Sequence, residues 1–134
     1  MTLRSLTLAL PVLALAACAV DPDNRYAAGA SSFVTGERYF KSNMRTYPVT
    51  IMSVDGRDTT LKSILVQPGQ RVLRLQGAPP PGWRWGPDEF FTLDVQPCTR
   101  YWIVAFKANE TDSHFTPRID YQEPVAGCQP AAVK

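Results

Sequence analysis

Short apolar segments alternate with turn-forming residues along most of this chain, and this pattern limits the possible folds more than any other feature. The segments are rich in β-branched and aromatic residues, and none of them shows a sustained 3.6-residue period. The chain also contains 12 prolines and 8 glycines, which favour turns over long helices. The segments that we predict to be strands are residues 48–54, 60–67, 71–76, 90–95, 101–106 and 114–122.

The turns between these segments indicate how the strands connect. Asp55-Gly56 is typical of a β-hairpin, because glycine adopts positive φ at little cost, and Pro68-Gly69 fits a type II turn. Residues 101–106 are apolar on both faces, which predicts a central strand, whereas Pro117 predicts an edge position for 114–122. We therefore expect an all-β fold, a small antiparallel β-sandwich of about six or seven strands.

The N-terminus carries a short apolar run that stops at a cysteine. Residues 6–17 are apolar apart from Thr7. As a helix they would span roughly 18 Å, whereas the hydrocarbon core of a bilayer is about 30 Å thick and requires about 20 residues. The run therefore predicts a secretion signal rather than a lasting membrane span. The residues Leu15-Ala16-Ala17-Cys18 resemble the lipobox of bacterial lipoproteins. This resemblance implies cleavage before Cys18, diacylglycerol on its sulfur and acylation of the new amino terminus.

This resemblance also predicts a location and a division of the chain. Ala19 follows the cysteine and favours the outer membrane of a Gram-negative cell, facing the periplasm or the cell surface. Several acyl chains hold a protein stably on a membrane, whereas one does not. We expect a lipoprotein signal peptide over residues 1–17, a lipidated N-terminus and flexible linker over 18–37, and the β-sandwich over 38–134. The alternative is an ordinary signal peptide in which the cysteine occurs by chance.

Two cysteines remain once Cys18 is assigned to the lipid. Cys98 and Cys128 form an even pair in an oxidising compartment, which predicts a disulfide. Closing this loop of about 30 residues stabilises the fold by roughly 3.5 kcal/mol in the chain-entropy model. A metal or redox pair has less support, because the sequence has no Cys-x-x-Cys and His114 is its only histidine.

Composition and motifs argue against several functions. The net charge is +2 with both signs mixed, so no basic block indicates nucleic acid. His114 lies in a polar turn without a nucleophile motif, and an enzyme would require it to be buried beside a carboxylate. Asp55 and Asp58 lack the rest of a calcium loop, and Asp88-Glu89 point to opposite faces of a strand. We expect a non-enzymatic protein without a metal or cofactor.

The segment 77–90, GAPPPGWRWGPDEF, is the best candidate for a functional surface. Pro79-Pro80-Pro81 forms a stiff extended piece, and Trp83 and Trp85 flank Arg84. Exposed tryptophans stack on sugar rings or anchor protein interfaces. The alternative is that both indole rings fold back over the end of the core.

Three short stretches are similar to small secreted β-sandwich modules of the PEGA or transthyretin-like kind. They are VDG at 54–56, PGQRVLRL at 68–75 and CTRYWIVA at 98–105, and the resemblance covers about 48–121. It implies a non-catalytic module. We therefore expect a membrane-anchored envelope lipoprotein that acts as a binding or assembly module for an envelope protein or polysaccharide. The alternatives are an inhibitor of a secreted hydrolase, which would present a protruding loop, and an envelope enzyme.

Overall fold

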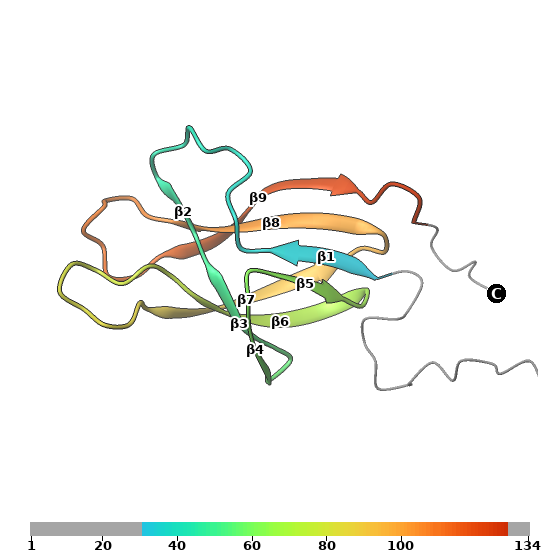
Figure 1. Ribbon diagram of the computed structural model, residues 1–134, viewed down its shortest axis with the longest axis horizontal. Helices are drawn as coiled ribbons and strands as arrows, with labels where there is room; N and C mark the ends of the chain where they lie inside the picture. Colours follow the sequence, from blue (N-terminus) through green and yellow to red (C-terminus); the bar gives the residue numbers. More distant parts are fainter. Residues whose placement is uncertain (1–30, 129–134) are drawn as a thin grey trace, which may run out of the picture.

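Residues 31–128 are described by the computed structural model, and they form two β-sheets packed face to face (Figure 1). Sheet A contains β5 (Ser63–Val66), β1 (Ser32–Thr35), β8 (Thr99–Phe106), β2 (Thr46–Pro48) and β9 (Thr116–Pro124). Sheet B contains β4 (Arg57–Leu61), β3 (Thr50–Val54), β6 (Gly69–Gln76) and β7 (Asp88–Val95). The prediction of a small all-β sandwich is confirmed. Within these residues there is no helix of the length and apolarity that crossing a membrane requires.

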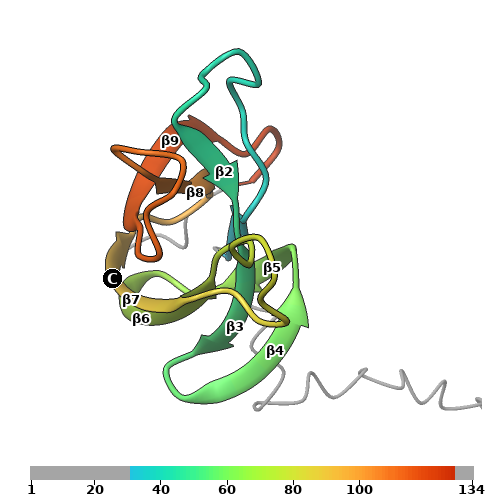
Figure 2. The ribbon, with the colours of Figure 1, turned by 90° about the vertical axis from the view of Figure 1, so that its left-hand side faces the viewer.

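Two of the predicted strands extend over both sheets, which is one reason why residues 31–128 contain nine strands. Segment 48–54 contains the last residue of β2 in sheet A and all of β3 in sheet B. Segment 60–67 contains the end of β4 in sheet B and all of β5 in sheet A. Strands that switch sheets in this way make the corners of a sandwich. The end-on view in Figure 2 shows β2 running into β3 and β4 running into β5.

A close backbone approach fixes the first of these corners. The N–H of Val49 donates to the carbonyl of Gly36, and the N–H of Gly36 donates to the carbonyl of Lys62. A side chain at Gly36 would collide with the carbonyl group of Val49. Gly36 follows β1 and contacts both the β2–β3 connection at Val49 and the β4–β5 connection at Lys62. Only a residue without a Cβ fits at this position.

The folded region extends further toward the N-terminus than the expected boundary at residue 38. Ser32–Thr35, within the stretch that the sequence assigned to the linker, forms β1 between β5 and β8. β1 is antiparallel to β5 but parallel to β8, so the sheet is not purely antiparallel. β1 belongs to the fold because Val34 is fully buried between the sheets.

The core lies between the inner faces of the two sheets. Its centre consists of fully buried aliphatic side chains from both sheets, namely Val34, Ile51, Leu73, Leu75 and Ile103. Tyr101 is also buried, and its hydroxyl accepts the N–H of Gln96 at 2.9 Å, which satisfies the polar end of the ring. β8 has neighbours on both edges, and within residues 31–128 β9 pairs only with β8. The predictions of a central strand at 101–106 and an edge strand at 114–122 are therefore confirmed.

The predicted Asp55-Gly56 hairpin turn and the predicted disulfide are present. Asp55 and Gly56 both have positive φ (49° and 78°) and join β3 to β4 as a hairpin. Gly69 also has positive φ, but Pro68-Gly69 connects β5 to β6 in the opposite sheet instead of closing a hairpin. Cys98 and Cys128 form a disulfide across 30 residues, which ties the segment after β9 to the start of β8.

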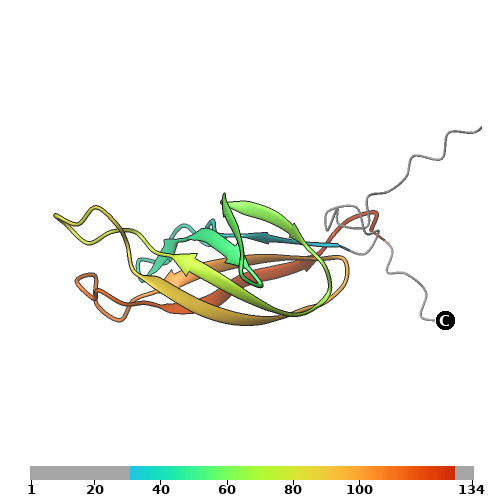
Figure 3. The same cartoon turned by 90° about the horizontal axis from the view of Figure 1, so that it is seen from below.

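The two ends of the sandwich differ in what they carry. The start of β1 and the end of the described chain after β9 lie at one end, on the right in Figure 1. The β6–β7 and β8–β9 loops lie at the other end, and the β6–β7 loop extends beyond the strands in Figure 3. The described chain therefore enters at one end and presents its candidate functional loop at the opposite end.

Candidate functional site

The Trp loop, defined as residues 77–87, connects β6 to β7 and is held by a narrow neck. The N–H of Gly77 donates to the carbonyl of Pro87 at 2.9 Å. A side chain at Gly86 would collide with the carbonyl of Gly77, and one at Gly77 would collide with the buried ring of Phe115. The neck is thus anchored on the core and leaves no room for larger residues at either glycine.

A tight turn presents the tryptophans at the tip of this loop. The N–H of Trp83 donates to the carbonyl of Pro80 at 3.0 Å, and Gly82 has φ of 82°. Pro81 before a glycine with positive φ is the pattern of a type II turn. The prolines and this turn restrict the backbone of the tip, so the loop holds its side chains in place at a small further entropic cost on binding.

Both indole rings are exposed to solvent. Trp83 is 72% exposed and Trp85 is 70% exposed, and the intervening Arg84 is exposed as well. The alternative in which the rings fold back over the end of the core is therefore excluded. An exposed indole offers a large apolar face and one N–H donor, a combination that suits stacking on a sugar ring or insertion into a protein interface.

A pocket of about 570 Å³ lies beside the exposed rings and extends to a second loop. Its lining residues are Pro80, Trp83, Arg84, Trp85, Gly86, Pro87, Ser113 and His114. Ser113 and His114 come from the β8–β9 loop, and sequence reasoning had not connected them with the tryptophans. Apart from Arg84, Ser113 and His114 the walls are apolar, so the pocket favours a ligand with an apolar face and few polar groups.

His114 lies next to a carboxylate but is not buried. Its Nδ1 is 2.9 Å from Oε1 of Glu89, and the His114 side chain is 79% exposed. The enzyme alternative required a buried histidine beside a carboxylate, and only the second half of that condition is met. The contact joins the β8–β9 loop to β7 and so steadies the rim of the pocket.

The other carboxylates singled out in the sequence take part in local contacts. The carboxylate of Asp55 accepts the N–H of Val72 at 2.9 Å and lies 3.0 Å from the Arg71 guanidinium. Asp58 is 3.7 Å from Arg74, and Asp88 accepts a hydrogen bond from the side chain of Gln76. Over residues 31–128, no group of three or more His, Cys, Asp or Glu side chains is placed to hold a metal ion.

A second group of aromatic side chains, which sequence reasoning missed, lies on sheet A. The face cluster, as we call it, consists of Tyr39, Phe40, Trp102 and Tyr121. The rings of Tyr39 and Tyr121 stack with centroids 3.9 Å apart, and Trp102 contacts both. Tyr121 raises the pKa of Tyr39, together with desolvation and the carboxylate of Glu123. No single stretch of sequence indicates this cluster, because its members come from a loop and two strands.

The predicted lipidation site, Cys18, lies outside the described residues, as do the expected signal peptide and most of the expected linker.

Comparisons with protein-family models, with curated proteins and with solved structures find no match for this chain. No family, relative or fold neighbour therefore indicates what the Trp loop binds. The resemblances to the lipobox and to PEGA-like modules stay predictions from the sequence.

Proposed function

We propose that this protein is a lipoprotein of the cell envelope, anchored to the outer membrane through Cys18, and that it acts as a non-enzymatic binding module. The Trp loop is the binding surface, and its partner is an envelope protein or an envelope polysaccharide. The observation that carries the proposal is the exposure of Trp83 and Trp85, at 72% and 70%, at the tip of a restrained loop.

The energetic cost of this exposure supports a binding role. Each large aromatic side chain that stays in water forgoes roughly 1.5–3 kcal/mol of burial free energy. Two such rings lie within three residues of each other and line the same apolar pocket. Exposed apolar surface that is concentrated in this way is typical of interaction sites, whereas isolated exposed apolar residues are common on any protein.

The position of the loop is compatible with an anchor at the N-terminus. The described chain enters at the end of the sandwich opposite the Trp loop (Figure 1). β8 connects the two ends and has eight residues, a length of roughly 26 Å at about 3.3 Å per residue. A lipid on Cys18 would tether the domain by the far end and leave the loop directed toward its partner.

The binding surface is tested with a double variant. The full chain and the variant Trp83→Ala with Trp85→Ala are immobilised and exposed to envelope extract, half of which has been digested with protease. We expect the full chain to retain a partner that the double variant releases, with affinity reduced at least tenfold. Met44→Ala is the matched control, because Met44 is 80% exposed on another loop. Retention that survives protease digestion identifies a polysaccharide, and retention that is lost identifies a protein.

The anchor is tested independently of the loop. Intact mass and membrane fractionation compare the chain expressed with its native N-terminus against Cys18→Ser. Added acyl mass and membrane association that both require Cys18 support the lipoprotein assignment. A soluble, unacylated chain contradicts the anchor but leaves the binding role of the Trp loop standing.

The protruding loop also favours one alternative, an inhibitor of a secreted hydrolase. Such an inhibitor inserts a stiff loop into the cleft of its target, and the Trp loop extends beyond the sheets and contains three consecutive prolines (Figure 3). In that case the partner retained in the double-variant experiment is a hydrolase, and the wild-type chain lowers its activity while the Trp83→Ala, Trp85→Ala variant does not.

A further inference from the structure

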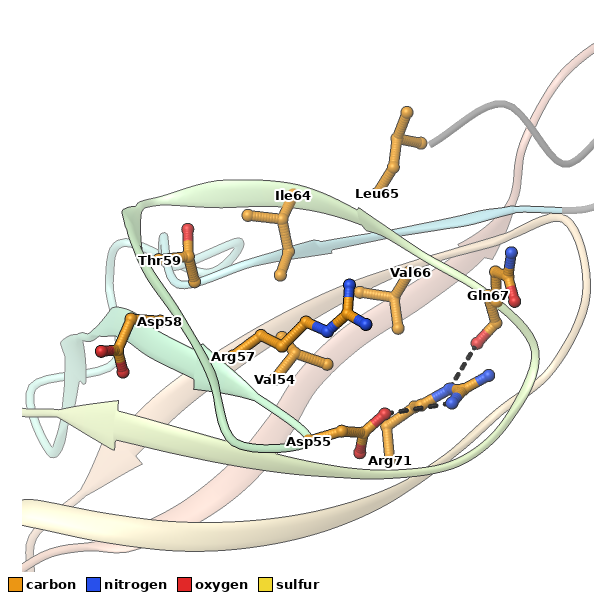
Figure 4. A pocket seen from close by; sticks show the side chains of 10 residues that line it. All are labelled: Val54, Asp55, Arg57, Asp58, Thr59, Ile64, Leu65, Val66, Gln67 and Arg71. Atoms are coloured by element: carbon orange, nitrogen blue, oxygen red, sulfur yellow. Dashed lines mark hydrogen bonds and ion pairs between the residues drawn. The ribbon is translucent and has the colours of Figure 1, made fainter. Parts of the chain in front are cut away.

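A second pocket lies at the open side of the sandwich, away from the Trp loop. β4 is the edge strand of sheet B and β5 is the edge strand of sheet A, and the pocket lies between them (Figure 4). The β3–β4 hairpin and the segment from Gln67 to Arg71 complete its walls, and its volume is about 300 Å³. Because no further strand within residues 31–128 covers these two edges, the pocket gives access to the side of the core.

The inner wall of this pocket is apolar. Val54 from β3 and Ile64 and Val66 from β5 line it. Ile64 and Val66 are core residues with exposed fractions of 5% and 4%, so the pocket reaches the boundary of the hydrophobic core. A hydrocarbon group placed here would be removed from water on contact with these side chains.

Two arginines line the same pocket, but only one has its guanidinium engaged. Arg71 donates to the carbonyls of Gln67 and Pro68 and pairs with Asp55, all at about 3 Å. Arg57 extends across the middle of the pocket in Figure 4, and within residues 31–128 its guanidinium makes no hydrogen bond or ion pair. The pocket therefore combines an apolar wall with one cationic group whose donors are available.

We propose that this pocket binds a small carboxylate attached to a short hydrocarbon group. A guanidinium pairs with a carboxylate through two parallel hydrogen bonds, and the apolar wall accommodates the hydrocarbon. The other charges of the lining, Asp55, Asp58 and Arg71, are already paired, which leaves a single cation and favours a monoanion over a phosphate dianion. A volume of about 300 Å³ is at the lower end for ligand pockets, so the ligand is small.

This ligand chemistry has two natural sources, a fatty acid and the C-terminal residue of a peptide. Octanoate represents the first, and N-acetyl-leucine represents the second. Stronger binding of octanoate assigns the pocket to fatty acids, and stronger binding of N-acetyl-leucine assigns it to peptide ends. Either result supports an apolar carboxylate site.

Titration calorimetry on the full chain tests the proposal. We expect octanoate to bind, octylamine not to bind, and affinity to rise from acetate to octanoate by up to about fourfold per methylene until the pocket is filled. Arg57→Gln should weaken octanoate binding about tenfold or more, because it removes a charge-assisted pair. Arg45→Gln is the matched control, since Arg45 is an exposed arginine on another loop and lies outside the pocket.

Two results would overturn the proposal. One is octanoate binding that is unchanged in Arg57→Gln, and the other is acetate binding as tightly as octanoate, which would indicate a bare anion site. The Trp83→Ala, Trp85→Ala variant should bind octanoate like the full chain. Failure at this pocket is therefore distinguishable from failure of the Trp loop.

Discussion

The face cluster and the Trp loop both present aromatic rings at the surface, but they differ in what surrounds those rings. Tyr39 and Phe40 are 42% and 50% exposed, and each ring contacts other rings of the cluster. Trp83 and Trp85 are more exposed and line a pocket whose other walls come from a second loop. Both groups are therefore partly exposed. The rings of the face cluster contact one another, whereas Trp83 and Trp85 contact no other aromatic ring within residues 31–128.

Contacts rather than exposure separate a structural role from a binding role. The face cluster joins the β1–β2 loop to β8 and β9, so its rings contribute to stability in the unbound protein. The tryptophans of the Trp loop gain their burial only when a partner covers them. We therefore expect substitutions in the cluster to change stability and substitutions in the loop to change binding.

Tyr121→Ala should have the largest effect on stability. The Tyr121 ring contacts three other rings, and its removal leaves a gap between the β1–β2 loop and sheet A. We expect the free energy of unfolding to fall by about 2–3 kcal/mol, measured by chemical denaturation. Tyr121→Phe is the control and should retain most of the stability. If the free energy of unfolding of Tyr121→Ala falls by less than about 0.5 kcal/mol, the face cluster does not stabilise the fold.

Asp120→Ala should have an intermediate effect. The register of β8 and β9 shifts between Trp102 and Ile103, so Asp120 is the extra residue of a bulge, and its carboxylate accepts the N–H groups of Tyr39 and Phe40 at 2.8 and 3.0 Å. Because the contact is exposed, we expect a loss of about 1 kcal/mol. Asp112→Ala provides a control of the same type on the β8–β9 loop, and protease sensitivity of the β1–β2 loop should rise only in Asp120→Ala.

Trp83→Ala combined with Trp85→Ala should leave stability nearly unchanged. Neither ring packs against the core, and substitutions of exposed side chains usually change the free energy of unfolding by less than about 0.5 kcal/mol. Denaturation curves that match those of the full chain, together with a loss of partner binding, would show that the Trp loop acts in binding and not in stability, unlike Tyr121. A stability loss above 1 kcal/mol would instead place the rings among the structural residues.

Local sequence patterns predicted most strands of the fold but not which sheet each strand belongs to. Asp55-Gly56 indicates its hairpin because the positive φ of both residues is a local property. The bends near Val49 and Lys62 have no such signature, since they depend on contacts with Gly36, which lies far away in the sequence. β1 is short and has a polar residue at each end, so its burial is decided by β5 and β8 and not by its own pattern.

The candidate sites follow the same rule. Trp83 and Trp85 stand out in the sequence because they lie in one proline-rich segment. Ser113 and His114 join them only because β8 and β9 bring their connecting loop to the same end of the sandwich. Arg57 follows an ordinary hairpin turn, and its position over an apolar wall depends on the switch of the chain from β4 to β5.

The smallest effect that we predict concerns the ionisation of Tyr39. The pKa of Tyr39 is raised above 10.0, chiefly by Tyr121 and then by desolvation and Glu123. A tyrosine whose pKa is higher in the folded state than in the unfolded state stabilises the fold fully below about pH 10, and this contribution is lost as the pH rises through the folded-state pKa. Absorbance titration of the full chain and of Tyr39→Phe should show that the variant loses a tyrosine ionisation above pH 10. An unchanged high-pH titration in Tyr39→Phe would contradict this prediction.

That titration also bears on the contrast between the two aromatic groups. Ionisation places a negative charge beside the Tyr121 ring and so weakens the face cluster, while the rings of the Trp loop have no ionisable group in the same range. The accessibility of the β1–β2 loop to protease should therefore rise at high pH before that of the Trp loop does. If both loops open together, the cluster does not act as a separate structural unit, and the difference in contacts between the two groups has no energetic consequence.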